Sequence, residues 1–245
     1  MEKLEIIVET VEDALAAERG GATQLDLKSH YPCSGVTPSA GAIERVLASV
    51  SIPVMVMIRP HARSFVPSKD DIKTACAEVR QAKKLGAVNF LTGFLSDDHK
   101  LNKDALKAIR DAVGECNLHS HLAWELTDDP EEAMEVLITL AFKSLRTGGK
   151  SAGSDAFGGN VADATNNIIK IKNFANNRIE ILLAGGITID NVQDIILRTG
   201  VTNIHCGRGA RTPADAQSPV DQEKVSAIRE AQLNAIGALN KKLKI

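Results

Sequence analysis

Short apolar or alternating segments recur eight times along the 245 residues, and helical stretches separate them. Strands that alternate with helices are typical of parallel sheets, because each helix carries the chain back to begin the next strand. Eight similar units in a chain of this length predict a single α/β domain, a closed (β/α)8 barrel of the TIM type. An open, doubly wound sheet is the alternative. The predicted strands span 4–9, 24–29, 53–59, 87–93, 117–124, 143–149, 178–186 and 202–208.

The segments between the strands have helical periodicity, and several of them end in glycine, as a helix C-cap often does. The predicted helices are 11–21, 39–50, 70–86, 102–114, 129–141 and 191–200, and the closing glycines are Gly20, Gly86, Gly114 and Gly200. A last helix, 221–243, is expected to cover the barrel wall or a partner subunit. Because no linker or low-complexity segment interrupts the pattern, we expect one domain over 1–245.

The composition argues against several classes of partner. A net charge of −2 and 3% aromatic residues do not favour a nucleic-acid partner. No apolar run is long enough to span a membrane. The cysteines Cys33, Cys76, Cys116 and Cys206 are scattered without a C-x-x-C pair, which favours reduced thiols. With no charged and apolar leader before the first strand, we expect a cytoplasmic location.

The alternation within the strands predicts an unusual barrel interior. In 24–28, Leu25 and Leu27 share one face, while Gln24, Asp26 and Lys28 share the other. Since helices cover the outside of such a barrel, the polar face must point to the axis, where branched aliphatic residues are usual. Buried charges must pair with each other or meet solvent and ligand, so either an internal ion network or a functional site is implied. The predicted interior polar residues are Glu5, Asp26, Lys28, Arg59, His119, His121, Arg146 and His205.

Glycines close the last two strands. Gly185 and Gly186 follow strand seven, and Gly207, Arg208 and Gly209 follow strand eight. In (β/α)8 barrels these two loops often hold a phosphate group, and glycine lets backbone N–H groups approach the anion. Arg208 adds a guanidinium group suited to phosphate oxygens. Two tight turns without any ligand are the alternative.

Other loops are expected at the same rim. Segment 30–38 offers Tyr31 and Cys33, and segment 60–67 offers His61 and Arg63. The glycine-rich segment 150–160 is expected to act as a lid or as an ordinary mobile surface loop.

Several segments resemble the CutC family, which is named for copper homeostasis and built as a TIM-type barrel. They are AERGGATQLDL (17–27), SGVTPSAGAI (34–43), SIPVMVMIRP (51–60), KKLGAVNFL (83–91) and HLAWE (121–125). The resemblance implies that Glu5, Arg59 and His121 are polar pore residues. The chain departs from the family's common pattern at Lys28, where a cysteine is frequent, and in 122–125 and 206–208.

The first functional hypothesis is an enzyme that acts on a small phosphorylated or otherwise anionic metabolite by isomerase- or aldolase-type chemistry. The anion would be held by Gly185, Gly186, Gly207 and Arg208. Arg59 would orient a carboxylate or hydroxyl group, and His121 with His119 would transfer protons, since imidazole titrates near neutrality.

Asp26 and Lys28 complete the predicted catalytic residues. A desolvated Lys28 could form a Schiff base with a carbonyl substrate. An ordinary ion pair of Lys28 with Asp26 or Glu5 is the alternative.

The second hypothesis, implied by the resemblance, is a Cu(I)-binding protein without catalysis. Cu(I) prefers sulfur ligands, and Cys33, Cys206 and His205 could meet at the rim. Met55 and Met57 are expected to fill the core instead. A third possibility is a scaffold that works through its outer helices, but it leaves the polar interior unexplained. A homodimer is possible, because barrels often bury a helix face in that way.

Overall fold

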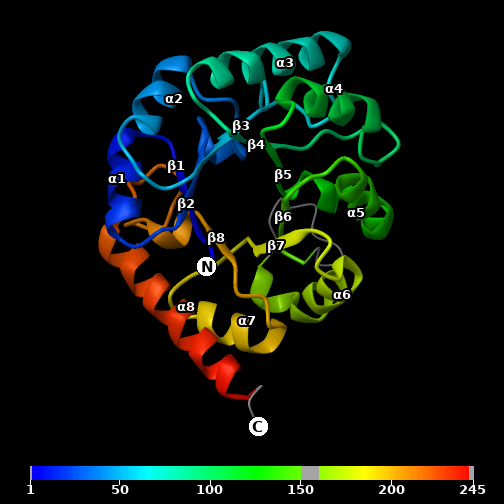
Figure 1. Ribbon diagram of the computed structural model, residues 1–245. Helices are drawn as coiled ribbons and strands as arrows, with labels where there is room; N and C mark the ends of the chain where they lie inside the picture. Colours follow the sequence, from blue (N-terminus) through cyan, green and yellow to red (C-terminus); the bar gives the residue numbers. More distant parts are fainter. Residues whose placement is uncertain (1, 150–159, 243–245) are drawn as a thin grey trace.

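Eight parallel strands pair in chain order and close into a barrel, as the sequence predicts. The computed structural model describes residues 2–149 and 160–242 (Figure 1). The predicted lid segment 150–160 therefore lies almost entirely outside the described residues. The strands are β1 (Leu4–Val8), β2 (Gln24–Leu27), β3 (Val54–Met57), β4 (Asn89–Thr92), β5 (Asn117–Ser120), β6 (Ser144–Thr147), β7 (Glu180–Leu183) and β8 (Ile204–Cys206).

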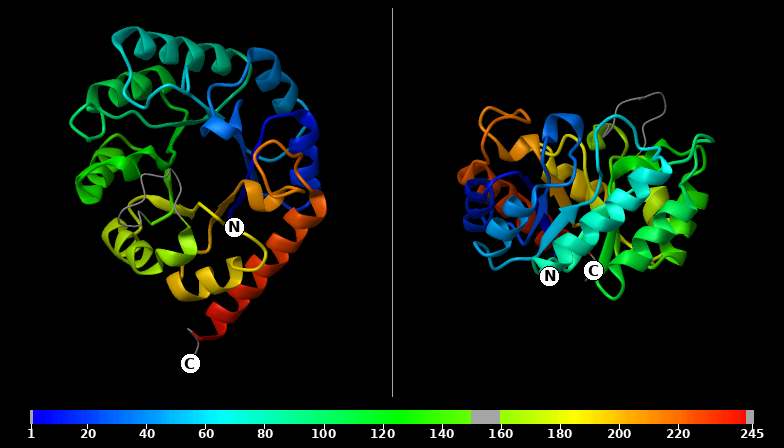
Figure 2. Two further views of the ribbon diagram at one scale, coloured as in Figure 1. Left: turned by 180° about the vertical axis from the view of Figure 1, so that it is seen from behind. Right: turned by 90° about the horizontal axis from the view of Figure 1, so that it is seen from above.

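The helices form a ring around the barrel, which Figure 2 shows from behind and from above. They are α1 (Val11–Arg19), α2 (Ala40–Leu47), α3 (Lys69–Lys84), α4 (Lys103–Val113), α5 (Pro130–Thr139), α6 (Thr165–Ala175), α7 (Val192–Thr199) and α8 (Gln222–Lys242). Four short 3-10 segments lie in the connections: η1 (Tyr31–Cys33), η2 (Leu122–Leu126), η3 (Val161–Asp163) and η4 (Arg208–Ala210).

Capping residues mark the beginning of most helices, and glycines mark the end of several. The residues before α1 to α5, which are Thr10, Ser39, Ser68, Asn102 and Asp129, each accept a backbone N–H from the first turn. Gly20, Gly114 and Gly200 follow α1, α4 and α7 at their C-termini. The sequence patterns did not single out α6, which has no side-chain cap at its start and is rich in asparagine.

The two faces of the strands separate as the alternation predicts. Val54 and Val56 of β3 belong to the large apolar core between barrel and helices. Met55 and Met57 from the same strand form a small separate cluster with Leu91. The methionines therefore pack within the barrel, and the aliphatic outer faces anchor the helices.

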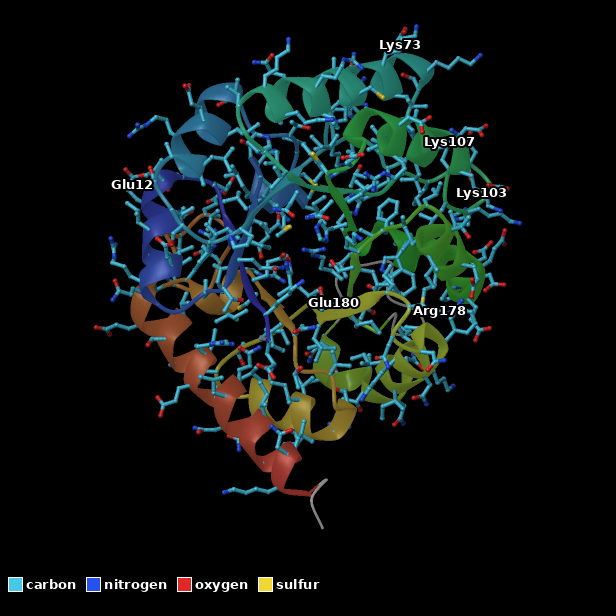
Figure 3. All side chains as sticks on the ribbon, viewed as in Figure 1. Glu12, Lys73, Lys103, Lys107, Arg178 and Glu180 are labelled. Carbon is cyan, nitrogen blue, oxygen red and sulfur yellow. The ribbon has the colours of Figure 1, made fainter. Side chains whose placement is uncertain are left out.

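Charged side chains extend from the outer helices into solvent. Lys73, Lys103 and Lys107, labelled in Figure 3, lie more than half exposed on α3 and α4. Among the described residues, no helix has the length and apolar character needed to cross a bilayer.

Helix α8 closes the ring by packing against α1 and α7. It coincides with the predicted helix 221–243 as far as the described residues reach, and Val225 and Ile228 are fully buried on its inner face. The contact with α1 is close at Gly20. A Cβ atom there would lie 2.6 Å from the Cβ of Val225 and 2.8 Å from the Gln222 carbonyl oxygen.

Replacing Gly20 by alanine is therefore expected to push α8 away from α1. Gly20 has an ordinary right-handed backbone (φ −74°), so the effect is purely steric. We expect a loss of about 1–3 kcal/mol in the free energy of unfolding, measured by urea denaturation followed by circular dichroism. The control is Gly41→Ala in α2, where nothing lies within 4 Å of the added Cβ. That variant should gain up to about 1 kcal/mol from helix propensity. Equal stability of the two variants would contradict the close contact.

Candidate functional site

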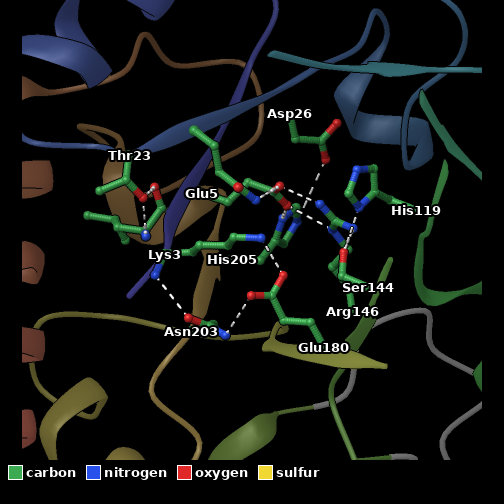
Figure 4. Close-up of polar contacts among 12 residues, drawn as sticks. Lys3, Glu5, Thr23, Asp26, His119, Ser144, Arg146, Glu180, Asn203 and His205 are labelled. Atoms are coloured by element: carbon green, nitrogen blue, oxygen red, sulfur yellow. Dashed lines mark hydrogen bonds and ion pairs between the residues drawn. The ribbon is translucent and has the colours of Figure 1, made fainter. Parts of the chain in front are cut away.

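A buried ion pair occupies the axis of the barrel. Glu5 of β1 accepts hydrogen bonds from Arg146 Nε (2.8 Å) and Nη2 and from His205 Nδ1 (2.7 Å), as Figure 4 shows. It also accepts one from Gln24 Nε2 (2.5 Å). Burial alone raises the pKa of Glu5, but the charge of Arg146 and the contact with His205 outweigh it, so the pKa lies well below its usual range. Glu5 is therefore ionised and fully paired.

Arg146 also connects the axis to the barrel wall. Its backbone carbonyl accepts a hydrogen bond from Trp124 Nε1 (2.8 Å), and Trp124 is fully buried in η2. Its Nη1 donates to Ser144 Oγ (3.0 Å). One residue thus contacts both the central carboxylate and the surrounding shell.

Asp26 and Lys28 form a second ion pair beside the first. Lys28 Nζ lies 2.7 Å from Asp26 Oδ2, and both side chains are almost completely buried. Asp26 Oδ1 has no hydrogen-bond partner within the described residues. Lys28 therefore forms an ion pair with Asp26, and one buried carboxylate oxygen of Asp26 has no donor among the described residues.

His205 lies between the two carboxylates. Because ionised Glu5 can only accept, His205 Nδ1 carries the proton of that contact, and Nε2 faces Asp26 Oδ2 at 3.9 Å. The sequence placed His205 in the barrel interior but gave it only a copper-binding role. His205 alternates with the outward-facing Ile204 and Cys206, as Asp26 does with Leu25 and Leu27, and this alternation could have placed His205 beside Asp26.

His119 and His121 lie on the opposite side of the axis. His119 Nδ1 and Ser144 Oγ form a hydrogen bond (2.8 Å), and burial, helped by the charge of Arg146, lowers the pKa of His119 to about 3. His121 Nδ1 accepts the Ala123 N–H (3.1 Å), and burial lowers its pKa well below the usual value. Both imidazoles are therefore neutral near neutral pH.

Arg59 holds two loops together. Its guanidinium group donates to the carbonyl oxygens of Cys33 (3.0 Å), Gly35 (3.1 Å) and Ala62 (3.2 Å), and it stacks 3.9 Å from the centre of the Phe65 ring. These contacts join the segments that follow β2 and β3.

A cavity of about 410 Å3 opens above the ion pairs. Its floor includes Asp26, Lys28, Arg146 and His205, while Met57 and Leu91 provide an apolar side. Its rim is formed by Gly185–Thr188, Gly207–Gly209, Tyr31, Ala214 and Ala216. The cavity brings together seven of the predicted site residues: Asp26, Lys28, His121, Gly185, Gly186, Gly207 and Arg208. Arg59 and His119 do not line it. No sequence signal pointed to Ala214 and Ala216.

The two glycine turns adopt conformations and contacts that a side chain would disturb. Gly185 and Gly186 have φ values of 90° and 70°, in the left-handed region that favours glycine. A Cβ at Gly209 would lie 2.0 Å from the Ile187 carbonyl oxygen, so the two turns pack directly on each other. Within the described part of the chain, no acceptor takes a hydrogen bond from the amides of Gly185, Gly186 or Gly207.

A metal ion fits this centre poorly. Ligand atoms of Glu5, Asp26 and His205 lie within 4.8 Å of one another. However, Arg146 and Lys28 already neutralise the two carboxylates, so an added cation would meet two positive charges.

A Cu(I) site made of Cys33, Cys206 and His205 is not assembled. Cys206 lies on the outer face of β8 within the apolar core, where its Sγ donates to the Ile187 carbonyl (3.5 Å) and burial raises the pKa of the thiol to about 12. His205 lines the cavity on the other face, and Cys33 is exposed.

The low pKa of His119 predicts a pH dependence of stability. The folded pKa of about 3 is depressed below the ordinary value of 6.5. Above pH 6.5 His119 is neutral in both the folded and the unfolded chain, and the free energy of unfolding has its full value. As the pH falls from 6.5 toward about 3, only the unfolded chain takes up the proton, so the free energy of unfolding decreases. His119→Asn should flatten the fall in unfolding free energy over this range, by up to about 1.4 kcal/mol per pH unit. Denaturant titrations at several pH values measure it. The control, His99→Asn at an exposed position, should keep the wild-type slope; equal slopes in all three proteins would contradict the assignment.

Comparison with solved structures supports the barrel fold and finds a CutC protein among the similar structures. Phosphoribosyl anthranilate isomerase from Thermotoga maritima aligns with a TM-score of 0.63 at 12% identity, covering 96% of this chain and all of that one. At this identity the likeness concerns the barrel alone. The crystal structure of a CutC protein from Streptococcus agalactiae aligns with a TM-score of 0.76 at 26% identity, covering 84% of this chain and 98% of that one.

Sequence comparison agrees with the resemblance noted in the chain's own motifs. The model of the CutC family matches residues 2–210. A human relative named "Copper homeostasis protein cutC homolog" is 35% identical over 213 residues, which cover 87% of this chain and 75% of the relative. A CutC family protein from Treponema denticola is 34% identical, covering 83% of this chain and 80% of the relative. The chain belongs to the CutC family.

Proposed function

We propose that the cavity binds a small phosphorylated metabolite and catalyses the enolisation step shared by isomerase- and aldolase-type reactions. One observation carries the proposal: a single cavity is lined both by the glycine turns after β7 and β8 and by the buried ion pairs of the barrel floor. Anion-binding groups and groups able to move protons therefore face the same space.

The rim supports binding of the anionic end. No acceptor among the described residues takes a hydrogen bond from the amides of Gly185, Gly186 or Gly207, which supports a role for these amides in binding an anion. The Arg208 side chain is exposed at the cavity edge, and no described carboxylate pairs with it. A phosphate group between the two turns would receive these donors together with the guanidinium charge.

The floor supports proton transfer. Asp26 Oδ1 is a buried carboxylate oxygen without a hydrogen-bond donor, which suits it to remove a proton from the carbon next to a carbonyl group. Lys28, which forms an ion pair with Asp26, would stabilise the negative charge that develops on the carbonyl oxygen. His205 would move the proton through Nε2. We therefore assign Lys28 to charge stabilisation rather than to a Schiff base.

The other predicted catalytic residues have different places in this scheme. His121 lines the cavity as a neutral imidazole able to hydrogen-bond substrate. Arg59 and His119 would act indirectly, through the loops and the Ser144–Arg146 contacts that they stabilise.

The names of the relatives support a second candidate, copper homeostasis by Cu(I) binding without catalysis. Among the thiols considered for it, Cys33 is exposed and Cys206 is buried on the outer face of β8. If copper binds, Cys33→Ser should release it and Cys206→Ser should not. Chelator competition on metal-free protein measures the bound Cu(I).

Anion binding is the first test of the enzyme proposal. Titration calorimetry of metal-free protein with inorganic phosphate and short sugar phosphates should show saturable binding. Arg208→Ala should weaken it about tenfold or more, because it removes a charge-assisted hydrogen bond. Arg45→Ala, which changes the net charge equally at an exposed position on α2, should bind like wild type. Binding that is equal in both variants would exclude Arg208 from the site.

Enolisation is the second test. In deuterium oxide, the protein should exchange the hydrogen next to the carbonyl group of a short ketose or aldose phosphate, as followed by proton NMR. Asp26→Asn should abolish exchange while still binding phosphate, because the amide keeps the shape but cannot accept the proton. Asp97→Asn, at an exposed position, should exchange normally. Undiminished exchange by Asp26→Asn would remove Asp26 from the mechanism, and stoichiometric Cu(I) with no phosphate binding would favour the copper candidate.

A further inference from the structure

The Tyr31 hydroxyl lies directly against the glycine turn after β8. A Cβ atom at Gly207 would lie 1.9 Å from Tyr31 Oη and 2.9 Å from Ile7 Cδ1. The space that any side chain at position 207 would need is therefore taken by the phenol. Gly207 is required at this point by the approach of Tyr31, and the hydroxyl group sits within the anion-binding rim.

Two cations lie close to the Tyr31 ring. Lys28 Nζ lies 5.9 Å from the ring centroid, and the Arg211 guanidinium carbon lies 5.4 Å from it. Arg211 is itself buried and donates to the Ile7 carbonyl oxygen (2.9 Å). The ring is therefore close both to a residue of the cavity floor and to a residue that is hydrogen-bonded to β1.

The backbone around Tyr31 is held equally firmly. Its N–H donates to Glu9 Oε1 (3.1 Å), and Arg59 donates to the carbonyls of Cys33 and Gly35 in the same loop. The flanking residues His30 and Ser34 adopt left-handed conformations, with φ of 59° and 69°. Such conformations persist where surrounding contacts determine them. Tyr31 is thus a fixed part of the rim.

The hydroxyl is a neutral donor whose proton is available. Burial raises the pKa of Tyr31, against smaller opposite influences of Arg208 and Arg211, so the phenol keeps its proton near neutral pH. The phenol oxygen lies against the turn at Gly207, next to Arg208. Within the described residues, no acceptor takes a hydrogen bond from the hydroxyl. Tyr31 can therefore donate its hydroxyl proton into the cavity that it lines.

We propose that Tyr31 is a specificity-determining residue whose hydroxyl donates a hydrogen bond to the bound anion and favours a tetrahedral phosphate over a planar carboxylate. The inference deepens the proposed function and rests on it. The donors come from three directions, which are the β7 turn, the β8 turn and the phenol. A phosphate ester has an oxygen for each, whereas a carboxylate has two oxygens in one plane.

Tyr31→Phe tests the proposal with little change in shape. Titration calorimetry with inorganic phosphate and glycerol phosphate should show about tenfold weaker binding than wild type, while the weak binding of acetate stays unchanged. Ser226→Ala, which removes an exposed hydroxyl on α8, is the control and should bind like wild type. Tighter phosphate binding by Tyr31→Phe would mean that the hydroxyl competes with the anion, and it would overturn the proposal.

A second measurement uses the fact that Tyr31 is the only tyrosine of the chain. Its ionisation can be followed by tyrosinate absorbance without interference from another phenol. The charged and titratable groups that face it are Lys28, Arg208, Arg211 and Cys206. Bound phosphate should raise the pKa of Tyr31 further, because a nearby negative charge disfavours phenolate. A fall toward the ordinary value on adding phosphate would show that the ring is displaced into water.

The two proposals fail in different ways. Wild-type protein that binds neither phosphate nor glycerol phosphate would refute the proposed function, and the role of Tyr31 with it. Wild-type protein that binds both, with Tyr31→Phe equal to it, would refute only the role of Tyr31.

Discussion

The contact between Glu5 and Arg146 is the constraint on which the interior depends. A lone carboxylate at the centre of a barrel would cost several kcal/mol of desolvation, so Glu5 needs the guanidinium group that Arg146 supplies from β6. Once Glu5 is ionised and paired, it sets the tautomer of His205 and turns Nε2 toward Asp26. One ion pair therefore orients the groups that line the cavity floor.

The floor is electrically balanced. Glu5 and Asp26 supply two negative charges, and Arg146 and Lys28 supply two positive charges. The neutral imidazole of His121 and the apolar side chains of Met57 and Leu91, which also line the cavity, add no charge. A ligand anion would therefore find its countercharge at the rim, where Arg208 is exposed, and its reacting atoms would lie over a neutral, pre-organised surface.

The alternation of residues along the strands predicted the barrel and the inward direction of its polar side chains, because both follow from backbone geometry alone. It could not predict which inward side chains reach the cavity. Arg59 and His119 are buried as expected, but carbonyl groups of two loops capture Arg59, and Ser144 contacts His119. The contact of Tyr31 with Gly207 joins residues far apart in the chain through irregular loops, and no local pattern encodes it. The family resemblance likewise suggested copper ligands. However, Cys206 and His205 are neighbours in one strand, so their side chains point to opposite faces of the sheet and cannot meet.

The bond from the Trp124 indole to the backbone of Arg146 has an experimental consequence. Trp124 is the single tryptophan of the chain, and its ring nitrogen contacts the residue whose side chain grips Glu5. The fluorescence emission of Trp124 is therefore expected to change when the contact between Arg146 and Glu5 changes. Tryptophan fluorescence can thus report on the charged centre of the barrel without an added label.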